Sequence, residues 1–173
     1  FAAEASARAG DTASVRAYLE EADPMLAREW GWSLRVRALM NANDLAGAEQ
    51  AASAAANELQ DASRRADAWR TLGDLRLMRS DQEGARTAFR RAMAARETSP
   101  AALDAARKLS DLPGLTPEEQ LRIGRLYLRH GNIDRGIAGL NAYLAAGRGS
   151  GVERAEIRLE IGRALFRQAK YAD

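Results

Sequence analysis

Small and bulky apolar residues recur along the chain at the spacing of one face of an α-helix. Leu121 and Leu128 lie two helical turns apart, and Leu159 and Phe166 repeat that spacing. Beside these stripes a small residue, such as Gly124, falls in the middle of the segment, with a bulky residue three to four positions away. The pattern predicts amphipathic helices that approach their neighbours closely.

The ends of these segments are marked by residues that start or stop helices. Asp23-Pro24 and Ser99-Pro100 each place proline directly after a capping residue, and Thr116 to Glu119 forms a capping box. Gly10-Asp11 and His130-Gly131-Asn132 combine a helix stop with a turn, and 147–151 is a glycine-rich connection. These signals predict short connections and an all-α protein with helices at about 2–9, 12–22, 25–41, 45–59, 62–79, 82–97, 101–110, 117–130, 133–146 and 152–168.

Internal repeats are the decisive feature of the sequence. A shift that places Gly124 on Gly162 also matches Leu121 with Leu159, Ile123 with Ile161, Arg125 with Arg163 and Arg129 with Arg167. A second shift, placing Gly73 on Gly124, matches Leu77 with Leu128, Ser80-Asp81 with Gly131-Asn132, and Phe89 with Leu140. Self-similarity at such periods is typical of arrays built from one helical unit.

The repeated residues resemble the tetratricopeptide repeat. The segment Trp69-x-x-Leu72-Gly73, followed by Ala85, Phe89 and Ala92, is similar to the family pattern W-x2-L-G-x2-Y, A-x3-F-x2-A. Arg76 stands at the tyrosine position of this repeat, and Tyr127 fills that position in the next one. Weaker copies lie around Trp32 with Ala48, Ala52 and Ala55, around Gly10 to Ala22, and from Arg158 to Leu165, the last of them cut off at Tyr171-Ala172-Asp173.

The resemblance implies a right-handed α-solenoid of antiparallel helix pairs, with about nine to ten helices. It predicts a single array over residues 1–173, interrupted by an extra helix or shrunken repeat near 100–116. Because the chain starts inside one helix pair and ends inside another, without polar capping helices, we expect a fragment of a longer array.

Composition agrees with a helical protein and narrows its chemistry. The chain has 173 residues, 46% hydrophobic and 29% charged, and alanine makes about a fifth of it. It has no cysteine and one histidine, so disulfides, thiol catalysis and histidine-rich metal sites are excluded. The net charge of +2 offers little counterion release, which argues against nucleic acid. No apolar run reaches the roughly 18 residues of a membrane span.

Nothing in the sequence selects a catalytic group. His130 stands at a helix end, where a polar residue faces carbonyls or solvent, and Glu118-Glu119 is explained by the positive N-terminus of its helix. We therefore predict a protein that is not an enzyme and uses no cofactor or metal. Trp30 and Trp32 flank Gly31, and they either pack between repeats or place Trp30 outward as an anchor for a ligand.

A binding surface is the best functional prediction. In the tetratricopeptide architecture the first helix of each pair lines a concave groove, and charged residues recur on those helices. Arginines bind carboxylates and phosphates in a bidentate manner. The sequence predicts an arginine-lined groove for a protein or peptide partner, an acidic one in particular; a solvated, partly self-neutralised surface is the alternative. The candidate groove residues are Arg37, Asn41, Arg70, Asp74, Arg125, Arg129, Arg163 and Arg167.

Two alternatives come from looser similarity. Residues 113–127 and 162–166 are similar to the helical arm of soluble lytic transglycosylases of bacterial envelopes, which would embrace peptidoglycan while the catalytic domain lies outside this chain. The other is a helical arm of a polysaccharide-export scaffold. Both favour the periplasm or cell envelope over the cytoplasm.

Overall fold

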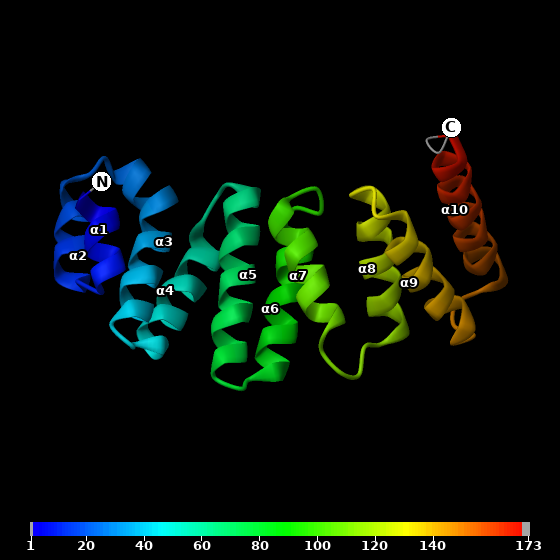
Figure 1. Cartoon of the computed structure of the whole chain (residues 1–173), viewed down its shortest axis with the longest axis horizontal. Helices are drawn as coiled ribbons and strands as arrows, with labels where there is room; N and C mark the ends of the chain where they lie inside the picture. Colours follow the sequence, from blue (N-terminus) through cyan, green and yellow to red (C-terminus); the bar gives the residue numbers. More distant parts are fainter. Residues whose placement is uncertain (1, 171–173) are drawn as a thin grey trace. The chain divides into compact units, whose positions relative to one another are not determined.

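The computed structural model describes residues 2–170, and these form an all-α structure, as the pattern of apolar residues predicts (Figure 1). No helix boundary differs from its predicted position by more than two residues. The final Tyr171-Ala172-Asp173 of the predicted last repeat lies outside the described residues. The helices are α1 (Ala2–Ala9), α2 (Thr12–Glu21), α3 (Pro24–Asn41), α4 (Leu45–Glu58), α5 (Ala62–Met78), α6 (Gln82–Ala95), α7 (Pro100–Ser110), α8 (Pro117–Arg129), α9 (Ile133–Ala145) and α10 (Gly151–Lys170).

The chain divides into two compact units, residues 1–105 (unit 1) and 106–173 (unit 2). Within unit 1, α1 to α6 pack in sequence order, and α1 also contacts α3. Within unit 2, α8 packs on α9 and α9 on α10. The division falls inside α7, in the 100–116 segment that departs from the repeat pattern. A single array over residues 1–173, with an irregular helix near 100–116, stays a prediction.

The same turn joins the two helices of four hairpins: α1 to α2, α3 to α4, α5 to α6 and α8 to α9. In each turn one residue adopts a left-handed backbone and the next residue caps the following helix. The capping residue's backbone N–H donates to the carbonyl five residues earlier, at 2.8–2.9 Å, which satisfies a carbonyl at the end of the first helix. The left-handed residues are Gly10, Asn43, Ser80 and Gly131, with φ of 75°, 61°, 63° and 79°.

The caps complete each turn from the other side. The side chain of Asp44 accepts the N–H of Gly47 at 2.8 Å, and that of Asp81 accepts the N–H of Gly84 at 2.9 Å. Asp11 and Asn132 occupy the same place in the first and last of the four hairpins. Each cap satisfies an N–H that has no partner inside its helix. The repeat found in the sequence is therefore also a repeat of turn geometry.

Glycine allows the helices of a pair to approach closely at two matched positions. A Cβ atom at Gly73 would lie 2.4 Å from Phe89 Cε1 on α6, and one at Gly124 would lie 2.7 Å from Leu140 Cδ1 on α9. The sequence repeat pairs Phe89 with Leu140, so both hairpins are closed by the same kind of contact. Any larger residue than glycine would force these helices apart.

Gly162 is the exception to this arrangement. Its predicted equivalence to Gly73 and Gly124 suggests a close helix contact, yet no described atom lies within 4 Å of a Cβ built there. The reason is the face that α10 buries: Ile157 and Ala164, two turns apart, are fully buried, and Gly162 lies on another side of the helix. None of the described helices covers that side.

The cores are small side chains around a few large ones. In unit 1, α4 buries a stripe of alanines, and Leu59, Leu72 and Phe89 are among the fully buried large residues. In unit 2, Leu140 and Ile157 belong to one cluster with Leu121 and Tyr143. Between residues 2 and 170 no helix combines the length and the apolar character needed to cross a bilayer.

The three matched glycines give a direct test of the packing. Gly73→Ala and Gly124→Ala should each lower the free energy of unfolding by about 1–3 kcal/mol, because the new methyl group overlaps Phe89 or Leu140. Gly162→Ala should instead raise it by about 0.5–1 kcal/mol, because alanine is the better helix former where space is open. Urea unfolding followed by circular dichroism measures all three. Equal effects at the three positions would contradict this packing.

Candidate binding groove

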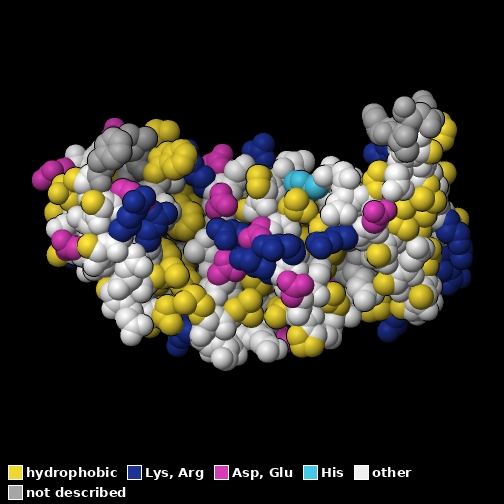
Figure 2. Space-filling view, viewed as in Figure 1, with side chains coloured by type: hydrophobic (Ala, Val, Ile, Leu, Met, Phe, Trp, Pro, Cys, Tyr) yellow, Lys and Arg dark blue, Asp and Glu magenta, His cyan; other side chains and the backbone are white. Residues whose placement is uncertain are grey.

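A hollow of about 460 Å³ lies between α3 and α5 in unit 1. The α3 side of its lining mixes four apolar with four polar or charged residues, and three of the four residues from α5 are charged. Figure 2 shows acidic and basic side chains interleaved over α5 and the helices beside it. The residues of the hollow that matter below are Trp30, Val36 and Met40 from α3, and Arg64, Asp67 and Arg70 from α5; we call this hollow the α3/α5 groove.

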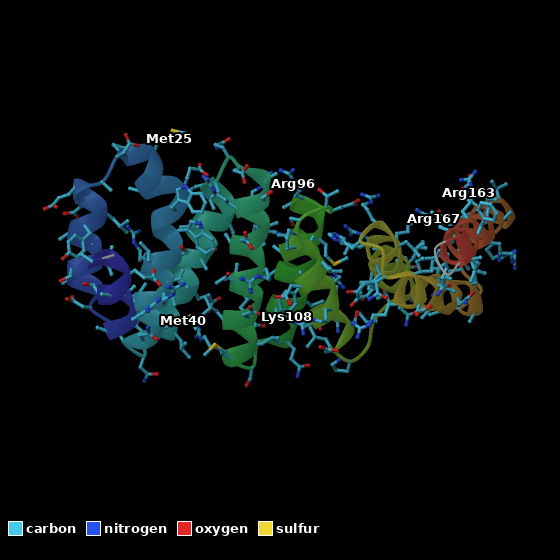
Figure 3. The ribbon with its side chains drawn as sticks, turned by 45° about the horizontal axis from the view of Figure 1, so that its top comes forward. Met25, Met40, Arg96, Lys108, Arg163 and Arg167 are labelled. Carbon is cyan, nitrogen blue, oxygen red and sulfur yellow. The ribbon has the colours of Figure 1, made fainter. Side chains whose placement is uncertain are left out.

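Trp30 is the largest exposed apolar side chain of the groove. It is 58% exposed, although the guanidinium of Arg64 stacks on its ring at 3.9 Å from the centroid. The same guanidinium donates to Glu29 Oε2 at 2.8 Å, so Arg64 joins α5 to α3. Met40 is also exposed and lies near the C-terminal end of α3, whereas Met25 lies near the N-terminal end of the same helix (Figure 3). Trp30 is thus exposed while Arg64 of the next helix pair packs on its ring, and its role as an anchor for a ligand stays a prediction.

Four of the predicted groove residues lie in unit 1, and each is engaged within the chain. Arg37 forms an ion pair with Glu4 of α1. The amide of Asn41 donates to the carbonyls of Ala7 at 2.9 Å and Arg8 at 3.2 Å, at the end of α1. Arg37 and Asn41 therefore hold α1 against α3.

Arg70 and Asp74, the other two in unit 1, pair with each other. Arg70 Nη1 lies 2.9 Å from Asp74 and 3.7 Å from Asp104. A guanidinium between two carboxylates is already neutralised. A carboxylate ligand that binds Arg70 would have to displace one of them.

The other four predicted residues lie in unit 2. Arg125 binds Glu160 through two bonds, from Nε at 3.1 Å and from Nη2 at 2.7 Å, which joins α8 to α10. The hydrogen bond with Glu160 raises the pKa of Arg125 above its usual value. Arg129 lies exposed in the last turn of α8, and Arg163 and Arg167 lie exposed and close together on α10 (Figure 3). The predicted set is thus divided between the two units.

Asp67 is the groove residue that sequence reasoning missed. It lies one turn from both Arg64 and Arg70 on α5, yet those arginines bond to Glu29 and to Asp74. Asp67 forms no ion pair or hydrogen bond with any side chain that the structure describes. Burial raises the pKa of Asp67, and the charge of Arg70 only partly offsets this. Asp67 lies three residues from each of the two arginines and therefore near their face of α5, but the sequence does not show which carboxylates the arginines bind.

A second hollow of unit 1, of about 890 Å³, lies between α2, α3 and α4. Many of its lining residues are alanine or leucine, and its charges include the Arg16–Glu20 ion pair of α2. Trp32 lines both hollows and so separates them. None of the eight predicted groove residues lies in this second hollow.

The candidates for chemistry have structural roles. His130 is the C-terminal cap of α8, as predicted from its position before Gly131. Glu119 closes the capping box of the same helix with Thr116. In the part of the chain that the structure describes, no three acidic or histidine side chains come together in an arrangement that could hold a metal ion.

Comparison with known proteins leaves the family open. Neither the protein-family models nor the curated proteins include a match to this chain. The resemblance to tetratricopeptide repeats therefore stays a prediction that depends on the residues quoted above.

Charge reversal tests which of these arginines stabilise the fold. Arg125→Glu should lower the free energy of unfolding by about 1 kcal/mol, since it sets a carboxylate against Glu160 in a half-exposed pair. Arg163→Glu, on the exposed face of α10, should change it by less than about 0.5 kcal/mol. Thermal and urea unfolding of both variants measure the difference. Recovery in the double variant Arg125→Glu/Glu160→Arg is the control, and equal effects of the two single changes would argue against the α8–α10 ion pair.

Proposed function

We propose that this protein is a non-catalytic helical module that binds a protein or peptide partner, and that the α3/α5 groove of unit 1 is a binding site. One observation carries the proposal. The groove is a hollow of about 460 Å³ whose lining includes a tryptophan that is more than half exposed and, further along the same helix, an exposed methionine. Tryptophan in a pocket is a common centre of binding energy at protein interfaces.

The groove is supported from both sides by contacts within the chain. Arg64 links α5 to Glu29 of α3, and Arg37 links α3 to α1. A groove held open by such contacts loses little conformational entropy when a partner binds. This preorganisation favours binding over a purely architectural role for α3 and α5.

The second hollow of unit 1 is the less suitable site despite its larger volume. Both hollows are lined by aromatic, apolar and charged residues, but many residues of the second hollow are alanines, whereas the α3/α5 groove contains the exposed ring of Trp30. The exposed arginines of α10 and the alternatives of a transglycosylase-like or polysaccharide-export arm stay predictions from the sequence.

Two methionines of α3 provide a matched test. Peptides would be selected from a random library displayed on phage, with the whole chain immobilised, and their affinities measured by fluorescence anisotropy. Met40→Glu should weaken binding of the selected peptides about tenfold or more, because it places a charge in the apolar part of the groove. Met25→Glu, at the other end of α3 and 73% exposed, should leave the affinity unchanged.

A third variant decides between the two hollows. Ala54 is exposed and lines the second hollow but not the α3/α5 groove. If Ala54→Glu abolishes binding and Met40→Glu does not, the partner binds in the other hollow and the proposal is wrong. A library that yields no binding peptide would also contradict it.

A further inference from the structure

Most of the charged side chains around the α3/α5 groove are paired within the chain. Arg37, Arg64 and Arg70 are its described cations. The carboxylates that line the groove or pair with these arginines are Glu4, Glu29, Asp67, Asp74 and Asp104. Only two of these carboxylates, Glu29 and Asp67, line the groove together with the three arginines, and Glu4 pairs with Arg8 as well, so what distinguishes the groove is how its charges pair and not an excess of one sign.

The pairing leaves one carboxylate of the groove without an ion pair. Every arginine of the groove contacts at least one carboxylate at hydrogen-bond or ion-pair distance, and Asp67 is the carboxylate that receives none of these contacts. A half-buried carboxylate without a partner is costly, because it loses hydration and gains no compensating bond. The raised pKa of Asp67 has the same cause.

One cation of the chain, the guanidinium of Arg64, is already bound in the groove. Arg64 lies between the carboxylate of Glu29 and the ring of Trp30, which combines an ion pair with a cation–π contact. Asp67 follows Arg64 by one turn, and the exposed ring of Trp30 and the thioether of Met40 line the same hollow. These groups suit the aliphatic stem and charged end of an arginine or lysine side chain.

We propose that the α3/α5 groove selects a peptide with a basic side chain, and that Asp67 is the carboxylate that binds the arginine or lysine of this peptide. The inference builds on the proposed peptide-binding function and replaces the acidic partner expected from the arginine count. An acidic side chain would meet Asp67 directly and would find the arginines already bonded to Asp74, Glu29 and Glu4. A basic side chain gives Asp67 the partner that the described side chains of the chain do not provide.

The test uses peptides selected on the unmodified chain. In each peptide, every arginine or lysine is replaced in turn by glutamine, and affinities for the wild-type chain and for Asp67→Asn are compared. One basic residue should be required: its replacement should weaken binding to the wild type about tenfold. The same replacement should have little effect on binding to Asp67→Asn, which shows that the two charges act together.

Control variants keep the outcomes distinct. Glu21→Gln removes an exposed carboxylate at the end of α2, outside the groove, and should not change the affinity. Unchanged circular dichroism and unfolding curves for Asp67→Asn show that a loss of binding is not a loss of fold.

Failure of the inference differs from failure of the proposed function. Peptides that depend on Met40 but need no basic residue, or that require an acidic one, overturn the role of Asp67 and leave the groove as the binding site. Equal loss from the peptide replacement in wild type and in Asp67→Asn would likewise overturn it. Peptides that bind independently of Met40 would instead contradict the groove itself.

Discussion

The close approach of two helices at a glycine, beside a turn that ends one helix and starts the next, is the constraint on which this structure depends. Gly73 against Phe89 and Gly124 against Leu140 set the distance between the helices of a pair. The left-handed residue and its capping neighbour set their direction. Because small residues fill most of the interface, the helices gain stability from many short contacts rather than from a few large side chains.

The electrostatics follow from this packing. The first helices of neighbouring hairpins lie close enough for ion pairs between them. Several arginines form such pairs and so join one helix to the next. Arg64 with Glu29 joins α5 to α3, and Arg125 with Glu160 joins α10 to α8. An arginine count taken from the sequence therefore overstates the positive charge available to a partner. In the α3/α5 groove, the charged group that forms no ion pair with the described side chains is the carboxylate of Asp67.

The helices and their ends could be predicted from the sequence because the signals are local. Thr116 to Glu119 and the proline at Pro24 mark helix starts through contacts within one turn. The turns at Gly10 and Gly131 were equally predictable, since glycine suits a left-handed backbone. Asn43 and Ser80 also adopt a positive φ, but their residue types alone do not predict it, and only their positions in the repeat indicate it.

The candidate site was less predictable because it depends on choices between partners far apart in the sequence. Arg37 pairs with Glu4 and Asn41 with the end of α1, over more than thirty residues. The repeat also suggests that Gly162 is packed like Gly73, whereas its surroundings depend on which face of α10 is buried. Asp67 belongs to no sequence motif. It can be identified as a candidate only after the structure shows that the neighbouring arginines bind other carboxylates.

Nuclear Overhauser effects between the glycine α-protons and the side chains opposite them test the central packing most directly. With a ring carbon of Phe89 2.4 Å from where a Cβ of Gly73 would stand, the account predicts strong cross-peaks from Gly73 Hα to the Phe89 ring. It predicts equally strong cross-peaks from Gly124 Hα to the Leu140 methyl groups. Absence of these cross-peaks in a folded, helical protein would contradict the shared architecture of the two hairpins.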